Sequence, residues 1–237
     1  IFKFNYQGII QNKIMKTQTI VTSSVSDLQE SIQAIKKNGA TLAVFAFAST
    51  GLVAVTHHLT ADRIAEQEKK QLQRTLDQVI DPQLYDNPLH SSCVLLNDPR
   101  LGNEALPAYI ATKQYEPVAM AVESVAPNGY NGKIILITGI NMQGEILGTR
   151  VLSHQETPGL GDKIDTRVSD WILSFNGKQL TDDNHAQWQV RKDGGEFDQF
   201  TGATITPRAV VQAVKNTLAY VQENQLAIIN QAPSCGE

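Results

Sequence analysis

An uncharged stretch from Gly39 to Thr56 constrains this chain more than any other feature of its sequence. Its 18 residues contain no Asp, Glu, Lys or Arg. An α-helix of that length spans about 27 Å, close to the roughly 30 Å hydrocarbon core of a bilayer. Because the stretch lacks the ionisable groups that line ion paths, it is expected to act only as an anchor. We therefore predict a single transmembrane helix over residues 39–58.

The basic residues around this stretch predict how the chain crosses the membrane. Lys36 and Lys37 precede it directly, whereas the next basic residue is Arg63. Basic flanks stay in the cytoplasm, so residues 1–38 are predicted to form a cytoplasmic tail and the C-terminal bulk to lie across the membrane. The alternative is a cleaved signal peptide, because residues 46–48 (Ala-Phe-Ala) resemble a cleavage triplet. That triplet lies in the middle of a long apolar run, which favours a retained anchor.

Residues 59–82 are predicted to form an amphipathic linker helix that begins at a Thr60 cap. Asp81-Pro82 is expected to end it, because a residue before proline disfavours helical geometry. Its apolar residues fall near one face; they are Ile64, Leu72, Leu76, Val79 and Ile80. At the other end of the chain, Met15 is a plausible translation start, in which case residues 1–14 would be upstream sequence.

Residues 83–237 are predicted to form a globular domain. The chain has 237 residues and a net charge of -4, which suffices for one sizeable core and gives no basic footprint for nucleic acid. Val- and Ile-rich runs separated by turn signals predict antiparallel strands, the later ones forming a hairpin. Short strands combined with helices indicate an α+β class. The predicted strands are 108–113, 117–126, 133–140, 145–152 and 187–192, and the predicted helices are 167–175 and the segment after Pro207.

A loop from Phe197 to Thr204 leads directly into the last predicted helix. Thr206 is a suitable N-cap and Pro207 a suitable first helical residue, and apolar residues then recur at helical spacing. The hydroxyl of Thr204 would lie beside unpaired backbone N–H groups and the positive end of the helix dipole, which together can seat a phosphate. On spacing alone, plain helix capping is the more common meaning of such a pattern.

The residues of this loop resemble a modification signature. Asp198-x-x-Thr201-Gly202-Ala203-Thr204 is similar to the flavinylation motif of the FMN-binding domain in the Rnf and sodium-pumping quinone reductase complexes. The resemblance implies that FMN is joined by a phosphoester to Thr204. It also implies that Asp198, Thr201, Gly202 and Ala203 surround the attachment point, where the two small residues leave room for a bulky group.

A second loop carries the sequence Glu-Thr-Pro-Gly-Leu-Gly from Glu156 to Gly161. Most Pro-Gly loops are only turns. This one resembles the segment that packs against the flavin ring system in the same family. The resemblance implies flavin contacts from Glu156, Thr157, Leu160 and Gly161. Glu156 and Thr157 would offer polar groups to the ring edge, and Leu160 an apolar surface.

The chain has two cysteines, Cys93 and Cys235. If the domain lies on the oxidising side of a membrane, the two can pair and tie the C-terminal tail to the domain. Two free thiols are the alternative. Neither position has the spacing of a metal site, so no metal is expected.

The order of these features resembles the G-type component of the Rnf complex more than the C-type component of the quinone reductase. The resemblance implies a bacterial inner-membrane protein with a periplasmic domain and covalent FMN. It implies a non-autonomous redox subunit that works with the A, B, C, D and E components of a translocase, which couples ferredoxin and NAD to ion movement. No neighbouring base activates Thr204, so a separate flavin transferase is expected. The alternatives are the quinone reductase component, a membrane-anchored flavin-domain regulator, or a scaffold without flavin.

Overall fold

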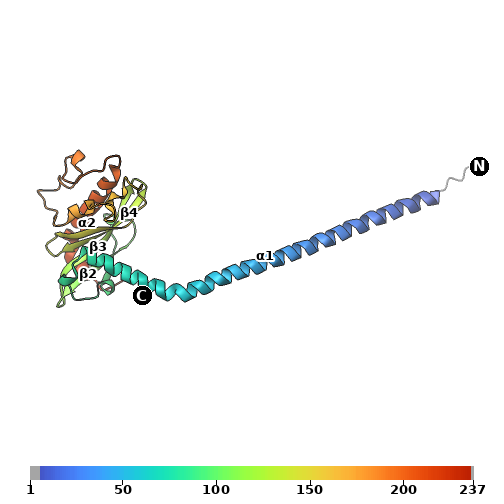
Figure 1. Ribbon diagram of the computed structural model, residues 1–237, viewed down its shortest axis with the longest axis horizontal. Helices are drawn as coiled ribbons and strands as arrows, with labels where there is room; N and C mark the ends of the chain where they lie inside the picture. The colour runs from blue at the N-terminus through green and yellow to red at the C-terminus, as the bar shows by residue number, and fades with distance from the viewer. Residues whose placement is uncertain (1–5, 236–237) are drawn as a thin grey trace, which may run out of the picture. The chain divides into compact units, whose positions relative to one another are not determined.

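The computed structural model describes the backbone of residues 6–235, and the side chains of residue 15 and of most residues from 35 onward. Residues 1–5 of the predicted tail lie outside this range. The chain divides into two compact units, Ile1–Ala65 and Glu66–Glu237. The first helix, α1 (Tyr6–Val79), begins in the first unit and ends in the second (Figure 1).

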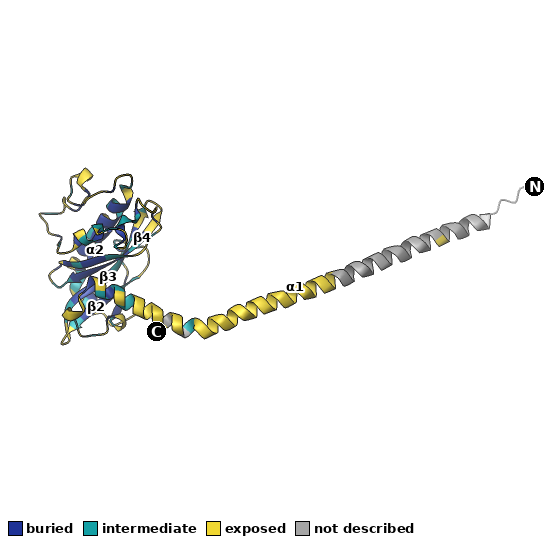
Figure 2. Cartoon of the chain, viewed as in Figure 1, coloured by how far each residue is buried: buried dark blue, intermediate teal, exposed yellow. Residues whose placement is uncertain are grey.

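Within the first unit, α1 contains the apolar segment predicted from the sequence. Residues Ile35–Ala61 have a mean hydropathy of 1.7 and are long enough to cross a membrane. The side chains from residue 35 to 60 are exposed all around the helix (Figure 2). Phe45 and Phe47 are 69% and 80% exposed, and a continuous surface of such side chains needs lipid or another protein to cover it. The predicted N-terminal apolar helix is thereby confirmed.

The linker segment does not begin with a cap. Thr60 lies inside α1 and donates its hydroxyl hydrogen to the carbonyl of Thr56 (2.8 Å). No glycine or proline occurs between Gly51 and Pro82, so nothing interrupts the helix there. The helix ends at Val79, just before the predicted stop, and the side chain of Asp81 then caps the short 3-10 helix η1 (Pro82–Leu84).

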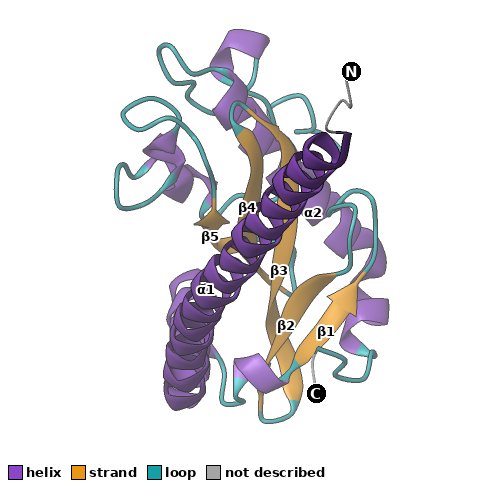
Figure 3. Ribbon diagram, turned by 90° about the vertical axis from the view of Figure 1, so that its right-hand side faces the viewer, coloured by secondary structure: helices purple, strands orange, loops and turns teal. Residues whose placement is uncertain are grey.

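The second unit is built on a five-stranded antiparallel sheet whose strands lie in chain order (Figure 3). Four strands and the β4–β5 hairpin were predicted and are confirmed, as is the α+β class. The first strand was not predicted, because four residues carry too short a pattern to recognise. The strands are β1 (Cys93–Leu96), β2 (Leu106–Lys113), β3 (Glu116–Gly129), β4 (Gly132–Asn141) and β5 (Ile146–Ser153).

Two elements predicted after the sheet are wrong. Residues 187–192 were expected as a strand but consist mostly of turns, with one isolated bridge to Phe197. The helix expected over residues 167–175 is reduced to a single 3-10 segment. Both segments follow the packing of Phe175, Trp188 and Phe197, whose ring centroids lie 4.6–6.2 Å apart in the core. The 3-10 helices here are η2 (Leu89–Ser91), η3 (Asp162–Ile164), η4 (Trp171–Phe175) and η5 (Arg191–Asp193).

Different helices cover the two faces of the sheet. Successive strand residues point to opposite faces, so Met120 and Ala121 of β3 belong to different clusters. Met120 lies in the cluster formed with the long helix α2 (Ile205–Ile229), which packs on β3 and β4. Ala121 lies in the cluster formed with the end of α1. The buried residues that α1 and the segment after it supply there are Leu76, Val79, Ile80 and Leu89.

The end of α1 lies directly on two glycines of the sheet. Gly139 of β4 and Gly148 of β5 are paired across the two strands. A Cβ atom added to Gly139 would overlap the backbone carbonyl of Val79, and one added to Gly148 would lie 2.9 Å from the Val79 Cα atom. The missing side chains therefore allow the helix backbone to touch the sheet.

We predict that Gly139→Ala lowers the free energy of unfolding by about 2–3 kcal/mol, because the clashing partner is helix backbone rather than a flexible side chain. Urea titration of the full chain in detergent measures this. Gly102→Ala is the control, since its Cβ would meet only the side chains of Leu106 and Val125, at 3.1 and 3.4 Å. Equal losses in both variants would contradict the close approach of Val79.

Glu123 of β3 makes the stability of this domain dependent on pH. Burial raises the pKa of its carboxyl group to about 7, and burial followed by the Glu123 charge raises the pKa of Tyr109 to about 12. A carboxyl group whose pKa is higher in the folded state binds more protons there than in the unfolded chain. Its contribution therefore falls as pH rises from about 4.5 to about 7.

We predict that Glu123→Gln is more stable than the unchanged chain by about 1–3 kcal/mol near pH 8, and equally stable near pH 4. Urea titrations at the two pH values test this. The control is Glu116→Gln, which changes an exposed glutamate of the same strand. A gain at Glu123 that does not vary with pH would show that ionisation is not its cause.

Candidate functional site

The loop before α2 brings Thr204 to the first turn of that helix. α2 begins at Ile205, so Thr204 occupies the N-cap position and Thr206 lies inside the first turn. The prediction of Thr206 as the N-cap is therefore wrong. A tight turn precedes the helix: the N–H of Ala203 donates to the carbonyl of Phe200 (3.2 Å), and Gly202 has a φ of +81° that favours glycine.

The Thr204 hydroxyl is available for chemistry. The residue is partly exposed, and its side chain makes no capping hydrogen bond within the described part of the chain. The first N–H groups of a helix lack intrahelical partners and carry the positive end of its dipole. Thr201 and Gly202 are exposed, so the approach to Thr204 is open to solvent. A phosphate linked to this oxygen would fit both the space and the local charge.

The second predicted loop follows β5 and lies against the first. The N–H groups of Leu160 and Gly161 both donate to the carbonyl of Thr157 (3.1 Å each), which closes a compact turn. The side chain of Leu160 is 43% exposed. Its Cδ2 atom would be only 3.6 Å from a Cβ placed on Gly202. The structure therefore brings the two loops together at Leu160 and Gly202.

Glu156 points into the protein rather than toward the surface. It is 4% exposed, and its carboxylate accepts hydrogen bonds from the Thr206 hydroxyl and from the N–H of Asn131 (3.1 Å). Its own N–H donates to Nδ1 of His154 (3.1 Å). In this arrangement the carboxylate is directed away from the open side, where a ring edge was expected. Thr157 is exposed and keeps its predicted access.

The charged residues near the loop form pairs with one another. Asp198 bonds Arg191 at 2.8 Å, and its carbonyl accepts from the indole N–H of Trp171 (2.8 Å). Arg208 holds Asp193 through two hydrogen bonds of 2.5 and 2.7 Å, and these bonds lower the pKa of the Asp193 carboxyl group. Asp198 therefore fastens the loop to its surroundings through an ion pair.

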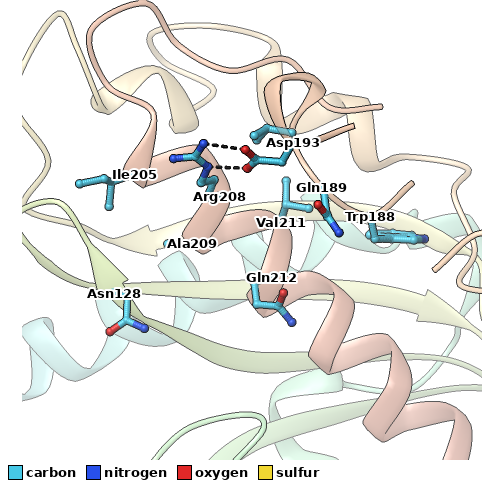
Figure 4. Close-up of a pocket in the computed structure, with 10 residues that line it drawn as sticks. Asn128, Trp188, Gln189, Asp193, Ile205, Arg208, Ala209, Val211 and Gln212 are labelled. Carbon is cyan, nitrogen blue, oxygen red and sulfur yellow. Dashed lines mark hydrogen bonds and ion pairs between the residues drawn. The ribbon is translucent and has the colours of Figure 1, made fainter. Parts of the chain in front are cut away.

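A cavity of about 410 Å³ opens beside the first turns of α2 (Figure 4). Ile205 and Arg208 border it, but none of the predicted ring contacts from Glu156 to Gly161 does. Ile205 is 46% exposed and, like Leu160, offers an apolar surface close to Thr204. Among the described residues, no group of three His, Cys, Asp or Glu side chains could hold a metal ion. The lining residues of the cavity are Asn128, Trp188, Gln189, Val190, Asp193, Ile205, Arg208, Ala209, Val211 and Gln212.

Two contributors to this site had no recognisable signal in the sequence. Asn131 was noted only as part of a turn, and it acts through its backbone N–H, which every residue type other than proline carries. The contact of Thr206 with Glu156 spans 50 positions of the chain. The signal that was readable is the small-residue loop ahead of an apolar helical repeat, because both lie within one short segment.

Comparisons with known proteins agree with this arrangement. Residues 27–79 match the family described as the RnfG N-terminal region, and residues 129–219 match the FMN-binding domain family. The chain is 62% identical over 205 residues to the G-type component of the ion-translocating oxidoreductase complex of Vibrio parahaemolyticus, covering 86% of this chain and 97% of that protein. It is 56% identical over 201 residues to the component of the same name from Shewanella oneidensis, covering 84% and 95%. The chain belongs to the RnfG family of ion-translocating oxidoreductase complexes, and it carries an FMN-binding domain.

Proposed function

We propose that this chain carries FMN joined by a phosphoester to Thr204 and relays electrons within a membrane-bound ion-translocating oxidoreductase. The observation that carries this proposal is the uncommitted hydroxyl of Thr204 at the N-terminus of α2. The helix end supplies unpaired amides and a positive dipole, which suit the charge of a phosphoester. FMN would supply the capacity to accept and release electrons, and the protein would hold it in place.

Individual residues have distinct roles in this proposal. Thr204 provides the attachment oxygen, and Thr201, Gly202 and Ala203 form the turn that leaves it accessible. Asp198 secures the start of the turn through Arg191. Thr157, Leu160 and Gly161 offer the surface on which the ring system lies. Leu160 is suited to this because it is an apolar side chain left partly exposed next to Gly202.

Attachment requires a partner enzyme. The oxygen of Thr204 would form a bond to the FMN phosphorus of FAD, the pyrophosphate bond would break, and AMP would leave. The hydroxyl proton would pass to a base of a flavin transferase, which uses magnesium. The partial exposure of Thr204 and the exposed turn before it support access by such an enzyme. A covalent bond retains the cofactor where free FMN would diffuse away.

The cellular setting is proposed on three grounds. The exposed apolar helix Ile35–Ala61 suits a single membrane anchor, and Lys36 and Lys37 favour a cytoplasmic N-terminus. A disulfide between Cys93 and Cys235 suits a periplasmic domain. The relatives are named as subunits of an ion-translocating complex. We infer that this chain lies in the bacterial inner membrane and works with the A, B, C, D and E components of the Rnf complex.

Two measurements test this function. Protein made together with the transferase is digested and its peptides are mapped by mass spectrometry, with an FMN increment expected on the peptide that contains Thr204. Affinity purification from the membrane then identifies associated subunits. Co-purification of quinone reductase subunits in place of the Rnf subunits would assign the flavoprotein to that complex. A colourless chain without an increment would refute the function.

A further inference from the structure

A buried hydrogen bond joins the two loops of the site. Thr206 is fully buried, and its hydroxyl donates to Oε2 of Glu156, which is 4% exposed. The N–H of Asn131 donates to the other oxygen, Oε1, at 3.1 Å. One carboxylate thus connects the β3–β4 turn, the loop that follows β5, and the first turn of α2.

Two glycines leave the space that this carboxylate occupies. A Cβ atom on Gly161 would lie 2.7 Å from Oε2 of Glu156 and 2.9 Å from the Thr206 hydroxyl oxygen. A Cβ atom on Gly129 would lie 2.8 Å from Oε1. Both distances are too short for real side chains. The surrounding backbone is therefore shaped around an inward-pointing Glu156, whose negative charge is favourable near the N-terminus of α2.

Further hydrogen bonds fix the loop on either side of Glu156. The N–H of Glu156 donates to Nδ1 of His154 (3.1 Å), and the side-chain amide of Asn131 donates to the carbonyl of Gln155 (2.7 Å). On the far side of the imidazole, Nε2 lies 3.9 Å from the carboxylate of Asp165. These bonds hold the loop to the sheet, whereas the bond from Thr206 holds it to α2.

We infer that Thr206 is a positioning residue that acts through Glu156. It fixes the loop of Leu160 and Gly161 relative to Thr204, and so determines how rigidly the flavin ring is held once the phosphate is attached. This inference rests on the proposed function. The Thr204 hydroxyl stays in place when Thr206 is changed, so attachment and ring order are separable properties.

The chain offers a matched control for this test. Thr217 is also fully buried and lies in the same helix, but its hydroxyl donates to the carbonyl of Ala213 within that helix (2.9 Å). Thr206→Val and Thr217→Val each remove one buried hydroxyl at nearly constant volume. Only the first leaves a carboxylate without its donor. Thr206→Ser keeps the hydroxyl and serves as the rescue variant.

The first readout is time-resolved fluorescence anisotropy of the attached flavin in the full chain, made with the transferase. The amplitude of the fast, local motion should rise at least about twofold in Thr206→Val, because the ring then lies on a loop no longer tied to α2. Thr206→Ser and Thr217→Val should match the unchanged chain. An unchanged amplitude in Thr206→Val, or an equal rise in Thr217→Val, would overturn the inference.

The second readout needs no flavin and separates this inference from the proposed function. Hydrogen exchange of the Asn131 amide should be at least about tenfold faster in Thr206→Val than in Thr217→Val, since that amide donates to the same carboxylate. Equal exchange in the two variants would overturn the coupling even if FMN is attached. Attachment at a residue other than Thr204 would refute the proposed function, while the exchange rates would still decide whether Thr206 couples the loops.

Discussion

Replacing Thr204 by alanine is expected to abolish covalent FMN while leaving the domain folded. The side chain makes no capping hydrogen bond among the described residues, so its loss should change the free energy of unfolding by less than about 1 kcal/mol. The attachment oxygen, in contrast, disappears completely. Intact-mass measurement of the full chain made with the transferase should lose the FMN increment, and the band on a denaturing gel should lose its flavin fluorescence.

Two neighbouring substitutions make this result specific. Thr201→Ala removes a hydroxyl from the same exposed turn and should keep the increment. Thr204→Ser keeps a hydroxyl at the N-cap position and should accept FMN, though more slowly if the transferase recognises the methyl group. An increment of FMN size in Thr204→Ala would show that the cofactor is attached elsewhere and would refute the assignment.

Breaking the disulfide is expected to have the largest effect on stability. Cys93 and Cys235 are bonded across a sequence separation of 142 residues. The tail also extends the edge of β1, because the N–H of Ser234 donates to the carbonyl of Cys93 (2.8 Å) and its hydroxyl accepts from the N–H of Leu95 (3.0 Å). Replacing both cysteines by serine should lower the free energy of unfolding by about 2–5 kcal/mol.

Urea titration with and without reductant measures this effect. Reductant should lower the midpoint of the unchanged chain and leave that of the Cys93→Ser/Cys235→Ser variant where it is. The variant should still accept FMN at Thr204, since the disulfide lies in a different hydrophobic cluster from α2. If both thiols of the purified chain react with an alkylating agent before reduction, the bond is absent and the prediction is wrong.

Local patterns were enough to predict most of the architecture. The uncharged run predicted the apolar helix because a long stretch without charges has few stable environments outside lipid. Alternating Val and Ile predicted β2 to β5, since one pattern repeats along each strand. The prediction failed at residues 187–192 and at Thr60. In the first case, aromatic packing from distant segments decides the backbone; in the second, an uninterrupted helix continues through a good capping residue.

The candidate site divides in the same way. The sequence by itself indicated the anchor, the antiparallel sheet and the Thr204 loop ahead of a helix, because each depends on residues that are close together in the chain. Only the tertiary structure decided that Glu156 turns inward to Thr206, that Asp198 pairs with Arg191, and that α1 rests on Gly139. The first and last of these join segments far apart in the chain, and their geometry follows from how the sheet and helices pack. Periodicity and composition describe one segment at a time and hold no information about that packing.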